Sequence, residues 1–227
     1  MTAEEYDAWY RTPRGSWIGE AEYRLLYRLL APAPGASLLD VGCGTGYFTR
    51  RFALDGHPAT GVDLDATMLA VARARRLAGE RYVRGNALAL PFEDAEFDCC
   101  VSVAALCFIA DEAAALAEML RVTRHRLALG LLHRRSILYL QKGRDGGKGA
   151  YRGAHWHTPH EVRELFSRVR CADPRLEYAV FLPGGGVLAR AVELGMPSST
   201  PLGAFLAAAA AADRSAGADS RHRTRLR

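Results

Sequence analysis

The sequence predicts a protein of the α/β class, with a doubly wound, mostly parallel sheet of about seven strands and an antiparallel pair at one edge. Short apolar runs of strand length alternate along the chain with amphipathic stretches of helical period. The first of these runs leads into a glycine-rich turn and then into a helical stretch. Strands and helices that alternate at this spacing form right-handed βαβ units, whose strands are parallel. A length of 227 residues suits one such domain with a full core.

The first part of the chain holds the most regular elements. A helix is expected over 20–30, where four leucines share one face before Pro32. Phe48 and Phe52, four residues apart, mark a second helix, and Asp65 can cap a third. The remaining elements expected here are strands at 37–41, 58–63, 81–86, 97–103 and 126–132 and a helix at 111–123.

Beyond residue 140 the pattern becomes less regular. The glycine-rich, charged stretch 143–153 predicts a mobile loop, and Thr158 followed by Pro159 predicts a helix that runs to about residue 168. Segments 176–182 and 187–194 are expected to form the antiparallel pair around a Pro-Gly-Gly-Gly turn. The predicted parts are a helical N-terminal cap (1–36), a domain (37–200) with a loop or lid at 141–158, and an Ala-rich segment with a disordered basic tail (201–227).

Composition narrows the class of protein. The five cysteines show no C-x-x-C spacing, which indicates reduced thiols of a cytoplasmic protein and argues against a disulfide framework or a zinc site. Much of the formal net charge of +5 comes from residues 213–227, with five arginines and two aspartates, so nucleic-acid binding is not expected. The N-terminus lacks the order of a secretory signal, and the longest small-apolar run, 202–212, is shorter than the ~20 residues of a membrane span.

The motif with the most chemical information is L-L-D-V-G-C-G-T-G at 38–46. A strand that ends near Asp40 runs into three glycines, and a helix begins directly after them. Glycine permits positive φ and lets a ligand touch the backbone, while the N-terminus of the following helix favours an anionic group. A dinucleotide fingerprint needs glycines at its first, third and sixth positions, and Tyr47 stands at the sixth. The spacing therefore disfavours a nicotinamide-dependent oxidoreductase, which is kept as an alternative.

Three further segments follow in order: G-V-D-L-D at 61–65, G-N-A-L-A-L-P-F at 85–92 and F-D-C-C-V-S-V at 97–103. With the glycine motif, they make the region from about residue 37 to 132 resemble the class I S-adenosylmethionine-dependent methyltransferases, especially the type 11 group that contains the ubiquinone and menaquinone C-methyltransferases. The resemblance implies a Rossmann-like fold and S-adenosyl-L-methionine as cofactor. It also implies transfer of the methyl group to an acceptor by direct displacement.

The resemblance assigns an expected role to each matching position. The methionine part of the cofactor would be held by Asp40 and by the backbone around Gly42, Cys43, Gly44 and Gly46. Asp63 would accept hydrogen bonds from both ribose hydroxyls, and such charge-assisted bonds are worth roughly 1.5–3 kcal/mol. The other implied contacts are Leu64 and Met68 beside the adenine, Asn86 and Ala87 at its edge, and Val103 and Ala104 near the sulfonium.

The acceptor is expected to be a small molecule. No N-P-P-Y-like or D-P-P-Y-like tetrapeptide follows the fourth expected strand, where methylases of base amino groups carry it, and no Pro-Cys pair offers a covalent C5 mechanism. The sequence departs from the family at three places, which are Asn86 in place of the commoner aspartate, Cys107 and Phe108 where histidines are frequent, and the turn 121–126, which lacks proline and glycines. The second departure removes a clue to the acceptor.

Acceptor contacts are expected from segments outside these motifs. The stretch 154–160 contains three histidines, but ligands one residue apart on a loop are not a recognised zinc spacing, so no metal is expected. Both a loop over the acceptor and plain structural packing are open interpretations there, as they are for the N-terminal aromatic and basic segment. The candidate residues are Tyr10, Arg11, Arg14, Trp17, Cys107, Tyr151, His155 and Trp156.

A general base is needed only if the acceptor must lose a proton, and His133 and His157 are the candidates. The protein otherwise mainly supplies proximity, orientation and a dry pocket. A non-catalytic S-adenosylmethionine-binding protein is the second alternative, which turnover would exclude. The identity of the acceptor, the atom that is methylated and the oligomeric state do not follow from the sequence.

Overall fold

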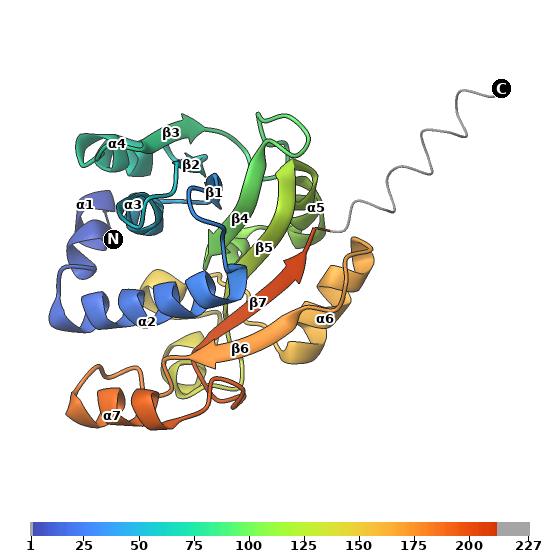
Figure 1. Ribbon diagram of the computed structural model, residues 1–227. Coiled ribbons are helices and arrows are strands. Elements are labelled where there is room, and N and C mark those ends of the chain that lie inside the picture. Colours follow the sequence, from blue (N-terminus) through green and yellow to red (C-terminus); the bar gives the residue numbers. More distant parts are fainter. Residues whose placement is uncertain (1, 213–227) are drawn as a thin grey trace.

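A seven-stranded sheet with helices packed against it organises residues 2–212, the part of the chain that the computed structural model describes (Figure 1). The strand order is β3-β2-β1-β4-β5-β7-β6. The strands are β1 (Leu38–Val41), β2 (Ala59–Asp63), β3 (Glu80–Arg84), β4 (Phe97–Val103), β5 (Thr123–Leu132), β6 (Arg175–Ala179) and β7 (Phe205–Ala211). Strands β1 to β5 are parallel, and β7 runs antiparallel to both β5 and β6. The predicted fold class is therefore confirmed.

The helices connect these strands and cover the sheet. They are α1 (Ala3–Trp9), α2 (Pro13–Leu30), α3 (Tyr47–Leu54), α4 (Ala66–Ala74), α5 (Glu112–Val122), α6 (Pro159–Arg168) and α7 (Val187–Gly195), with short turns η1 (Leu106–Phe108), η2 (Tyr139–Gly143) and η3 (Gly149–Tyr151). In Figure 1, α2 runs across the foreground, and it packs against β5, β6 and β7. Helix α3 packs on β1 and β2, and α5 packs on β4 and β5.

Local sequence explains where several helices begin. The Asp65 carboxylate accepts the backbone N–H of Thr67 at 2.7 Å, so it caps α4 as predicted. Asp111 caps α5 in the same way, and Thr158 with Glu161 forms a capping box on α6. Helix α2 begins earlier than expected, because Thr12 caps a first turn that starts with proline.

The C-terminal part differs from its prediction. Segment 187–194, expected as a strand, lies wholly within helix α7, and the partner of β6 is β7 instead. The Ala-rich segment, expected outside the domain, is thus an interior strand between β5 and β6, and the domain boundary at residue 200 was wrong. The expected disordered tail at 213–227 lies outside the described residues.

Pairing, not local propensity, makes β7 a strand. Alanine favours helix in isolation, but Ala207 to Ala210 are buried between two hydrogen-bonded neighbours. The strand also requires glycine at one position of its neighbour, because the Phe205 ring of β7 lies over Gly130 of β5. A Cβ atom at Gly130 would be 2.2 Å from Phe205 Cζ.

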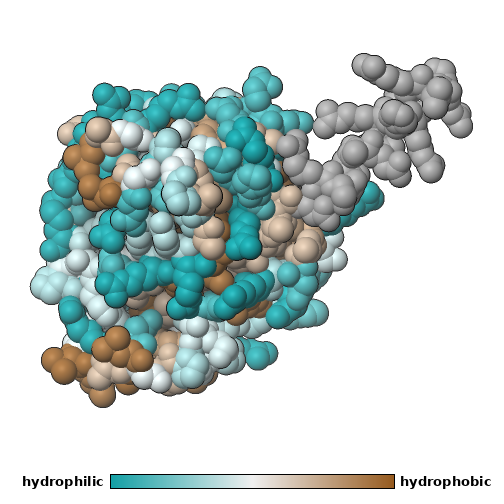
Figure 2. Space-filling model, viewed as in Figure 1, coloured by the Kyte–Doolittle hydropathy of each residue, from teal (hydrophilic) through white to brown (hydrophobic). Residues whose placement is uncertain are grey.

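Exposed apolar side chains gather on α7. Figure 2 shows a hydrophobic area at the lower left, over this helix, where Val187, Leu188 and Leu194 are mostly exposed. None of the helices within residues 2–212 has the length and apolar character needed to cross a membrane.

Candidate functional site

The expected cofactor site lies where the sheet changes its winding direction. Strand β1 pairs with β2 on one side and with β4 on the other. In open α/β sheets, ligands bind beyond the carboxyl ends of the strands at such a point. The glycine motif follows β1 directly, and Asp63 ends β2. The topology therefore brings the expected cofactor residues to one edge of the sheet.

The loop between β1 and α3 needs its glycines. Gly42, Gly44 and Gly46 have φ values of +73°, +53° and +78°, in the left-handed region that favours glycine. A Cβ atom at Gly42 would lie 2.2 Å from the Cβ of Ala105, in the segment that follows β4. A Cβ atom at Gly46 would lie 2.3 Å from the Tyr82 hydroxyl. The loop is therefore a close-fitting cradle of backbone, as the sequence predicted.

Asp63 links this loop to the end of β2. Its Oδ2 atom accepts the N–H of Gly44 at 2.8 Å, and its Oδ1 atom accepts the N–H of Asp65 at 2.9 Å. A carboxylate has about four acceptor positions, so two stay available for hydroxyl donors. The half-buried side chain is thus oriented in advance for the expected contact with a ribose.

Asp40 faces the protein interior. Its Oδ2 atom accepts the Thr49 hydroxyl of α3 at 2.6 Å. Burial, with a smaller contribution from the charge of Asp63, raises the pKa of Asp40 to about 7 although the Thr49 hydrogen bond lowers it. Asp40 therefore holds α3 against β1, and its expected contact with the methionine ammonium stays a prediction.

The expected adenine contacts lie on the two loops that follow β2 and β3. These strands are paired, with Asp63 opposite Arg84. Leu64 is exposed although apolar, and Met68 is half-buried on α4. Asn86 is exposed, with its side-chain oxygen accepting the N–H of Leu88 at 3.0 Å. An exposed leucine beside an amide and a small residue, Ala87, suits the face and edge of a purine ring. Cys43 is buried beneath the glycine loop.

The N-terminal helix closes over the glycine loop. Asp7 of α1 is buried and pairs with Arg75 at 2.6 Å and with Arg50 at 3.4 Å, and also with Arg11. Arg50 in turn donates to the carbonyl of Thr45 at 2.8 Å. The sequence analysis did not single out Asp7, because an acidic residue in a short N-terminal helix carries no local signal of burial.

Aromatic rings continue this cover toward the sheet. A Cβ atom at Gly44 would lie 3.7 Å from the Tyr6 ring. The ring of Tyr10 stacks on that of Tyr47, the residue that follows the glycine motif and begins α3, with 3.9 Å between their centroids. The predicted N-terminal cap therefore contacts the cofactor loop directly.

A cavity of about 240 Å³ lies next to this loop. Its lining includes Val103 and Ala104 from the end of β4, and also Tyr6, which contacts the loop. Two lining residues have a backbone that side chains rarely adopt, with φ of +58° at Ala104 and +61° at Val180. Such strain persists only where surrounding structure maintains it, and it concentrates at functional sites. The cavity is therefore the candidate acceptor site.

Some of the predicted acceptor residues line this cavity. Tyr10, Arg14 and Tyr151 do, in addition to Val103 and Ala104. Tyr151 arrives on the strap, the name used here for residues 139–157 between β5 and α6. The predicted loop in this region consists of the turns η2 and η3 and connecting segments.

The other acceptor candidates lie elsewhere. Trp17 lines an open groove between α2 and α7. Cys107 and His155 line a separate cavity beside α5. Trp156 is buried and packs against Tyr139 and Tyr151, and Arg11 pairs with Asp7. The structure does not bring these five residues into the cavity of about 240 Å³.

Glu22 is a cavity residue that the sequence analysis missed. It lies among the Tyr6, Tyr10 and Tyr151 side chains at the cavity wall. Burial raises the pKa of Glu22 to about 8, and the nearby charge of Glu193 adds to the shift. A signal was present in the sequence: Glu22 falls on the face of α2 that carries Leu25 and Leu26, a position normally apolar.

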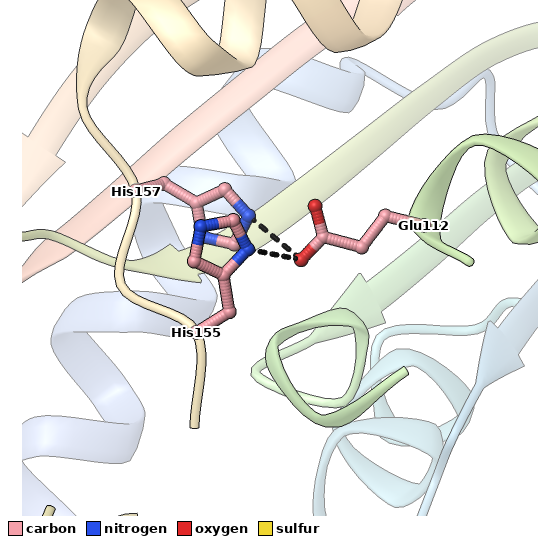
Figure 3. A group of neighbouring side chains, drawn as sticks. All are labelled: Glu112, His155 and His157. Carbon is pink, nitrogen blue, oxygen red and sulfur yellow. Dashed lines mark hydrogen bonds and ion pairs between the residues drawn. The ribbon is translucent and has the colours of Figure 1, made fainter. Parts of the chain in front are cut away.

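The two histidines expected as bases are in other environments. His133 is buried, its Nδ1 atom is 2.9 Å from the carbonyl oxygen of Gly203, and burial lowers its pKa. His157 faces Glu112 at the N-terminus of α5, as His155 does (Figure 3). Burial raises the pKa of Glu112, but hydrogen bonds and charge from the two histidines outweigh it, and the pKa is lowered overall. Neither predicted base lines the cavity of about 240 Å³.

Comparison with known proteins agrees with this geometry. A family model described as "Methyltransferase domain" matches residues 39–126. The chain is 46% identical over 91 residues to a malonyl-[acyl-carrier protein] O-methyltransferase of Serratia marcescens, covering 40% of this chain and 35% of that protein. It is 35% identical over 159 residues to a demethylmenaquinone methyltransferase of Roseiflexus castenholzii, covering 68% and 62%. The chain thus matches about a third to three fifths of the length of these relatives.

The fold agrees over a longer span. A solved structure of an S-adenosylmethionine-dependent methyltransferase from Thermotoga maritima superposes with a TM-score of 0.74 at 23% identity, covering 92% of this chain and 95% of that one. At this identity the likeness concerns the fold. The family match covers the strands and loops of the cofactor side, where the glycine cradle and Asp63 lie. Residues 39–126 of this chain thus match the methyltransferase domain family, and the relatives that share this region are named as methyltransferases.

Proposed function

We propose that the protein transfers a methyl group from S-adenosylmethionine to a small-molecule acceptor, with the acceptor's reactive atom in the cavity between α1, α2 and the end of β4. The observation that carries this proposal is the contact between cavity and cofactor loop. Tyr6 and the segment beginning at Val103 line the cavity, and Tyr6 and the neighbouring Ala105 approach the glycines of the loop. The reacting atoms of donor and acceptor can therefore meet at that boundary.

The cofactor, when bound, supplies a methyl group on a positively charged sulfur that is already activated for displacement. The chain would hold the donor through the glycine-loop backbone and Asp63, with Leu64, Met68, Asn86 and Ala87 around its adenine. Helix α1, held by Asp7 and its arginines, would exclude water above the loop. The mostly apolar cavity walls would orient the acceptor in a near-attack arrangement.

Glu22 replaces the two histidines as our candidate proton acceptor. Its carboxylate lines the cavity, whereas His133 and His157 do not. A carboxyl group with a pKa of about 8 can take up and release a proton close to neutral pH. If the acceptor is a hydroxyl or an amine, its proton would pass to Glu22 as the new bond to carbon forms. An acceptor that needs no deprotonation would instead use Glu22 for positioning.

We further propose that the protein acts in the cytoplasm. The five cysteines, four of them buried, form no disulfide in the described part of the chain, which is typical of a reducing compartment. The relatives described above are named for malonyl-[acyl-carrier protein] and for demethylmenaquinone. A cavity of about 240 Å³ can enclose only the reacting part of such acceptors. The acceptor is therefore proposed as a small molecule or a small group presented to the cavity.

Ligand stabilisation tests the cofactor part of this proposal. S-adenosylhomocysteine at a hundredfold its dissociation constant should add about 2.7 kcal/mol to the free energy of unfolding, measured as a rise in Tm. NADH should add nothing. Stabilisation by NADH without stabilisation by S-adenosylhomocysteine would favour the oxidoreductase alternative and contradict the proposal.

Turnover tests the catalytic part. The protein is incubated with S-adenosylmethionine and a panel of phenols, amines, thiols and quinols, and S-adenosylhomocysteine and methylated products are measured by mass spectrometry. Formation of both above the level without protein is expected. Tight binding of S-adenosylhomocysteine with no product across the panel would support the non-catalytic alternative.

A further inference from the structure

Two histidines and a glutamate meet on the side of the sheet that carries α5, apart from the proposed acceptor cavity. The Oε1 atom of Glu112 lies 2.9 Å from His155 Nδ1 and 3.0 Å from His157 Nε2. One ligand atom from each residue lies within 4.8 Å of the other two. Figure 3 shows both imidazoles directed at the same carboxylate oxygen, from a segment that faces the start of α5.

The backbone around the histidines explains why they point the same way. The N–H of His157 donates to the carbonyl of Leu132 at 2.8 Å, and its carbonyl accepts the N–H of Arg134 at 2.9 Å. The N–H of His155 donates to the carbonyl of Cys107 at 2.7 Å. The segment is thus held in an extended form beside β5, and in extended backbone the side chains two residues apart share a face. In the sequence, the two histidines were judged too close together on a loop to bind one metal ion. The extended backbone allows both imidazoles to point to the same side.

We propose that Glu112, His155 and His157 bind a divalent transition-metal ion of the zinc type. Two imidazoles and one carboxylate are a donor set that Zn²⁺ uses where a fourth position stays open. Ligand atoms about 2.0–2.1 Å from a tetrahedral ion are roughly 3.3 Å apart. The two glutamate–histidine separations of 2.9 and 3.0 Å need to grow by only a few tenths of an ångström, and the two histidine nitrogens, which lie within 4.8 Å of each other, need to adopt the same spacing.

The surroundings of the cluster leave space for a fourth ligand, and the nearby Arg134 guanidinium has partners of its own. A cavity of about 470 Å³, lined by Glu112 and His155 with Phe108 and Asp111, opens beside the cluster, so water or a small anion can reach it. Arg134 Nη2 is 3.4 Å from His155 Nε2. Arg134 also pairs with Glu161 at 3.0 Å and donates to the carbonyl of Trp156 at 2.9 Å.

Without metal, the same three side chains form a hydrogen-bonded group in which the Glu112 carboxylate accepts a hydrogen bond from each imidazole. The metal-bound cluster needs Glu112 as a charged ligand, whereas the cluster without metal needs it only as a hydrogen-bond acceptor. A glutamine at this position can still accept hydrogen bonds through its carbonyl oxygen. It is uncharged and a poor ligand for zinc, so it separates the two interpretations while keeping the shape of the side chain.

Metal binding would also act on the strap. His155 and His157 end this segment, and Tyr151 of the strap lines the acceptor cavity. An ion that joins the end of the strap to α5 would restrain the movement of the strap. The proposed metal site is separate from the cofactor loop, so zinc binding can be tested independently of the proposed methyl transfer.

The test uses the full-length protein without an affinity tag, since a histidine tag would itself bind zinc, after dialysis against a chelator. Zn²⁺ is titrated and followed by calorimetry and by Tm. We expect one site per chain and a rise in Tm of roughly 5–10 °C at free Zn²⁺ a hundredfold above the dissociation constant. Trypsin cleavage at Lys142, Arg144, Lys148 and Arg152 of the strap should slow when zinc is present.

Three variants make the test specific. Glu112→Gln and His157→Ala should each lose the zinc-dependent rise in Tm and weaken binding at least tenfold, and Glu112→Gln should keep the Tm of the metal-free wild type. His160→Ala, which removes an exposed histidine three residues away, is the matched control and should bind like the wild type. No saturable binding by the wild type would overturn the proposal. So would equal binding by Glu112→Gln, or a loss in His160→Ala as large as in His157→Ala.

Discussion

On the cofactor side of the sheet, the loops after β1, β2 and β3 hold most of the residues with an expected ligand contact, all between residues 40 and 87. On the acceptor side, one cavity is lined by Tyr6 of α1, Glu22 of α2, Ala104 after β4, Tyr151 of the strap and Phe205 of β7. The first region is built from backbone amides and one carboxylate at strand ends. The second is built from side chains that only folding brings together.

This difference indicates that the two regions can change independently. The cofactor loop depends on glycine backbone and on a single oriented carboxylate, so its requirements are local and strict. The acceptor cavity depends on packing between distant segments, where a change of volume is felt through neighbouring side chains. Substitutions in one region should therefore leave the other region's measured property unchanged.

The largest effect is expected from Asp63→Ala on the cofactor side. Loss of charge-assisted hydrogen bonds worth roughly 1.5–3 kcal/mol should weaken S-adenosylhomocysteine binding roughly 10- to 150-fold by calorimetry. The variant should stay folded, because the side chain is half-buried and caps only two backbone N–H groups. Asp173→Ala, which removes an exposed carboxylate, is the control and should bind normally. Unchanged affinity in Asp63→Ala would remove the cofactor role of this residue.

A somewhat smaller effect is expected from Gly130→Ala on the acceptor side. The added Cβ would lie 2.2 Å from Phe205 Cζ and would push that ring toward the cavity it lines. Overpacking of this kind costs about 1–3 kcal/mol. Denaturant unfolding should report this loss and turnover should fall, while the affinity for S-adenosylhomocysteine stays that of the wild type.

The double variant Gly130→Ala/Phe205→Leu serves as the control for this effect, since the smaller side chain leaves room for the methyl group. It should recover part of the lost stability. A fall in cofactor affinity in Gly130→Ala would break the comparison, because it would show that the two regions share one packing unit.

The smallest effect is expected from Glu22→Gln, and it depends on pH. The pKa of Glu22 is raised from 4.5 to about 8, so its contribution to stability is fully present below about pH 4.5 and is lost as pH rises through about 8. Glutamine does not titrate. The variant should therefore gain stability relative to the wild type as the pH rises from 5 to 9, seen as diverging Tm curves.

Glu164→Gln, at an exposed position on α6, is the matched control and should follow the wild-type curve. Parallel curves for Glu22→Gln and the wild type would mean that the Glu22 carboxyl is solvated, and its role as proton acceptor would lose its support.

Much of the cofactor side could be predicted because its signals are contiguous. The glycine motif, Asp63 and the capping residues Asp65 and Asp111 all act on backbone within a few positions of themselves. The acceptor side was predicted only where the residues were conspicuous, as with Tyr10 and Tyr151. Trp17 and Trp156 are equally conspicuous, yet Trp17 lines a separate groove and Trp156 packs in the core.

The missed residues share one property. Glu22, Asp7 and Glu112 are ordinary acidic residues on helices, and what singles them out is their surroundings in space. Glu112 is 43 positions from His155 in the chain. The spacing of the histidines was therefore judged without the carboxylate that completes the group. No local pattern marks Glu112 or Asp7 in this way, whereas the place of Glu22 on the apolar face of α2 was a signal that could have been used.

Hydrophobic period, glycine conformation and helix capping are local physics, so the sequence alone predicted the parallel half of the sheet and the positive φ of the glycine loop, and its motifs carried the resemblance to the methyltransferases. Only the tertiary structure decided that the Ala-rich segment is β7 and that segment 187–194 is helical. Alanine has no strong preference for a strand, and its state here is set by the open edges of β5 and β6 between which it pairs. The acceptor cavity and the histidine–glutamate cluster also depend on tertiary packing, since each exists only where segments far apart in the chain come together.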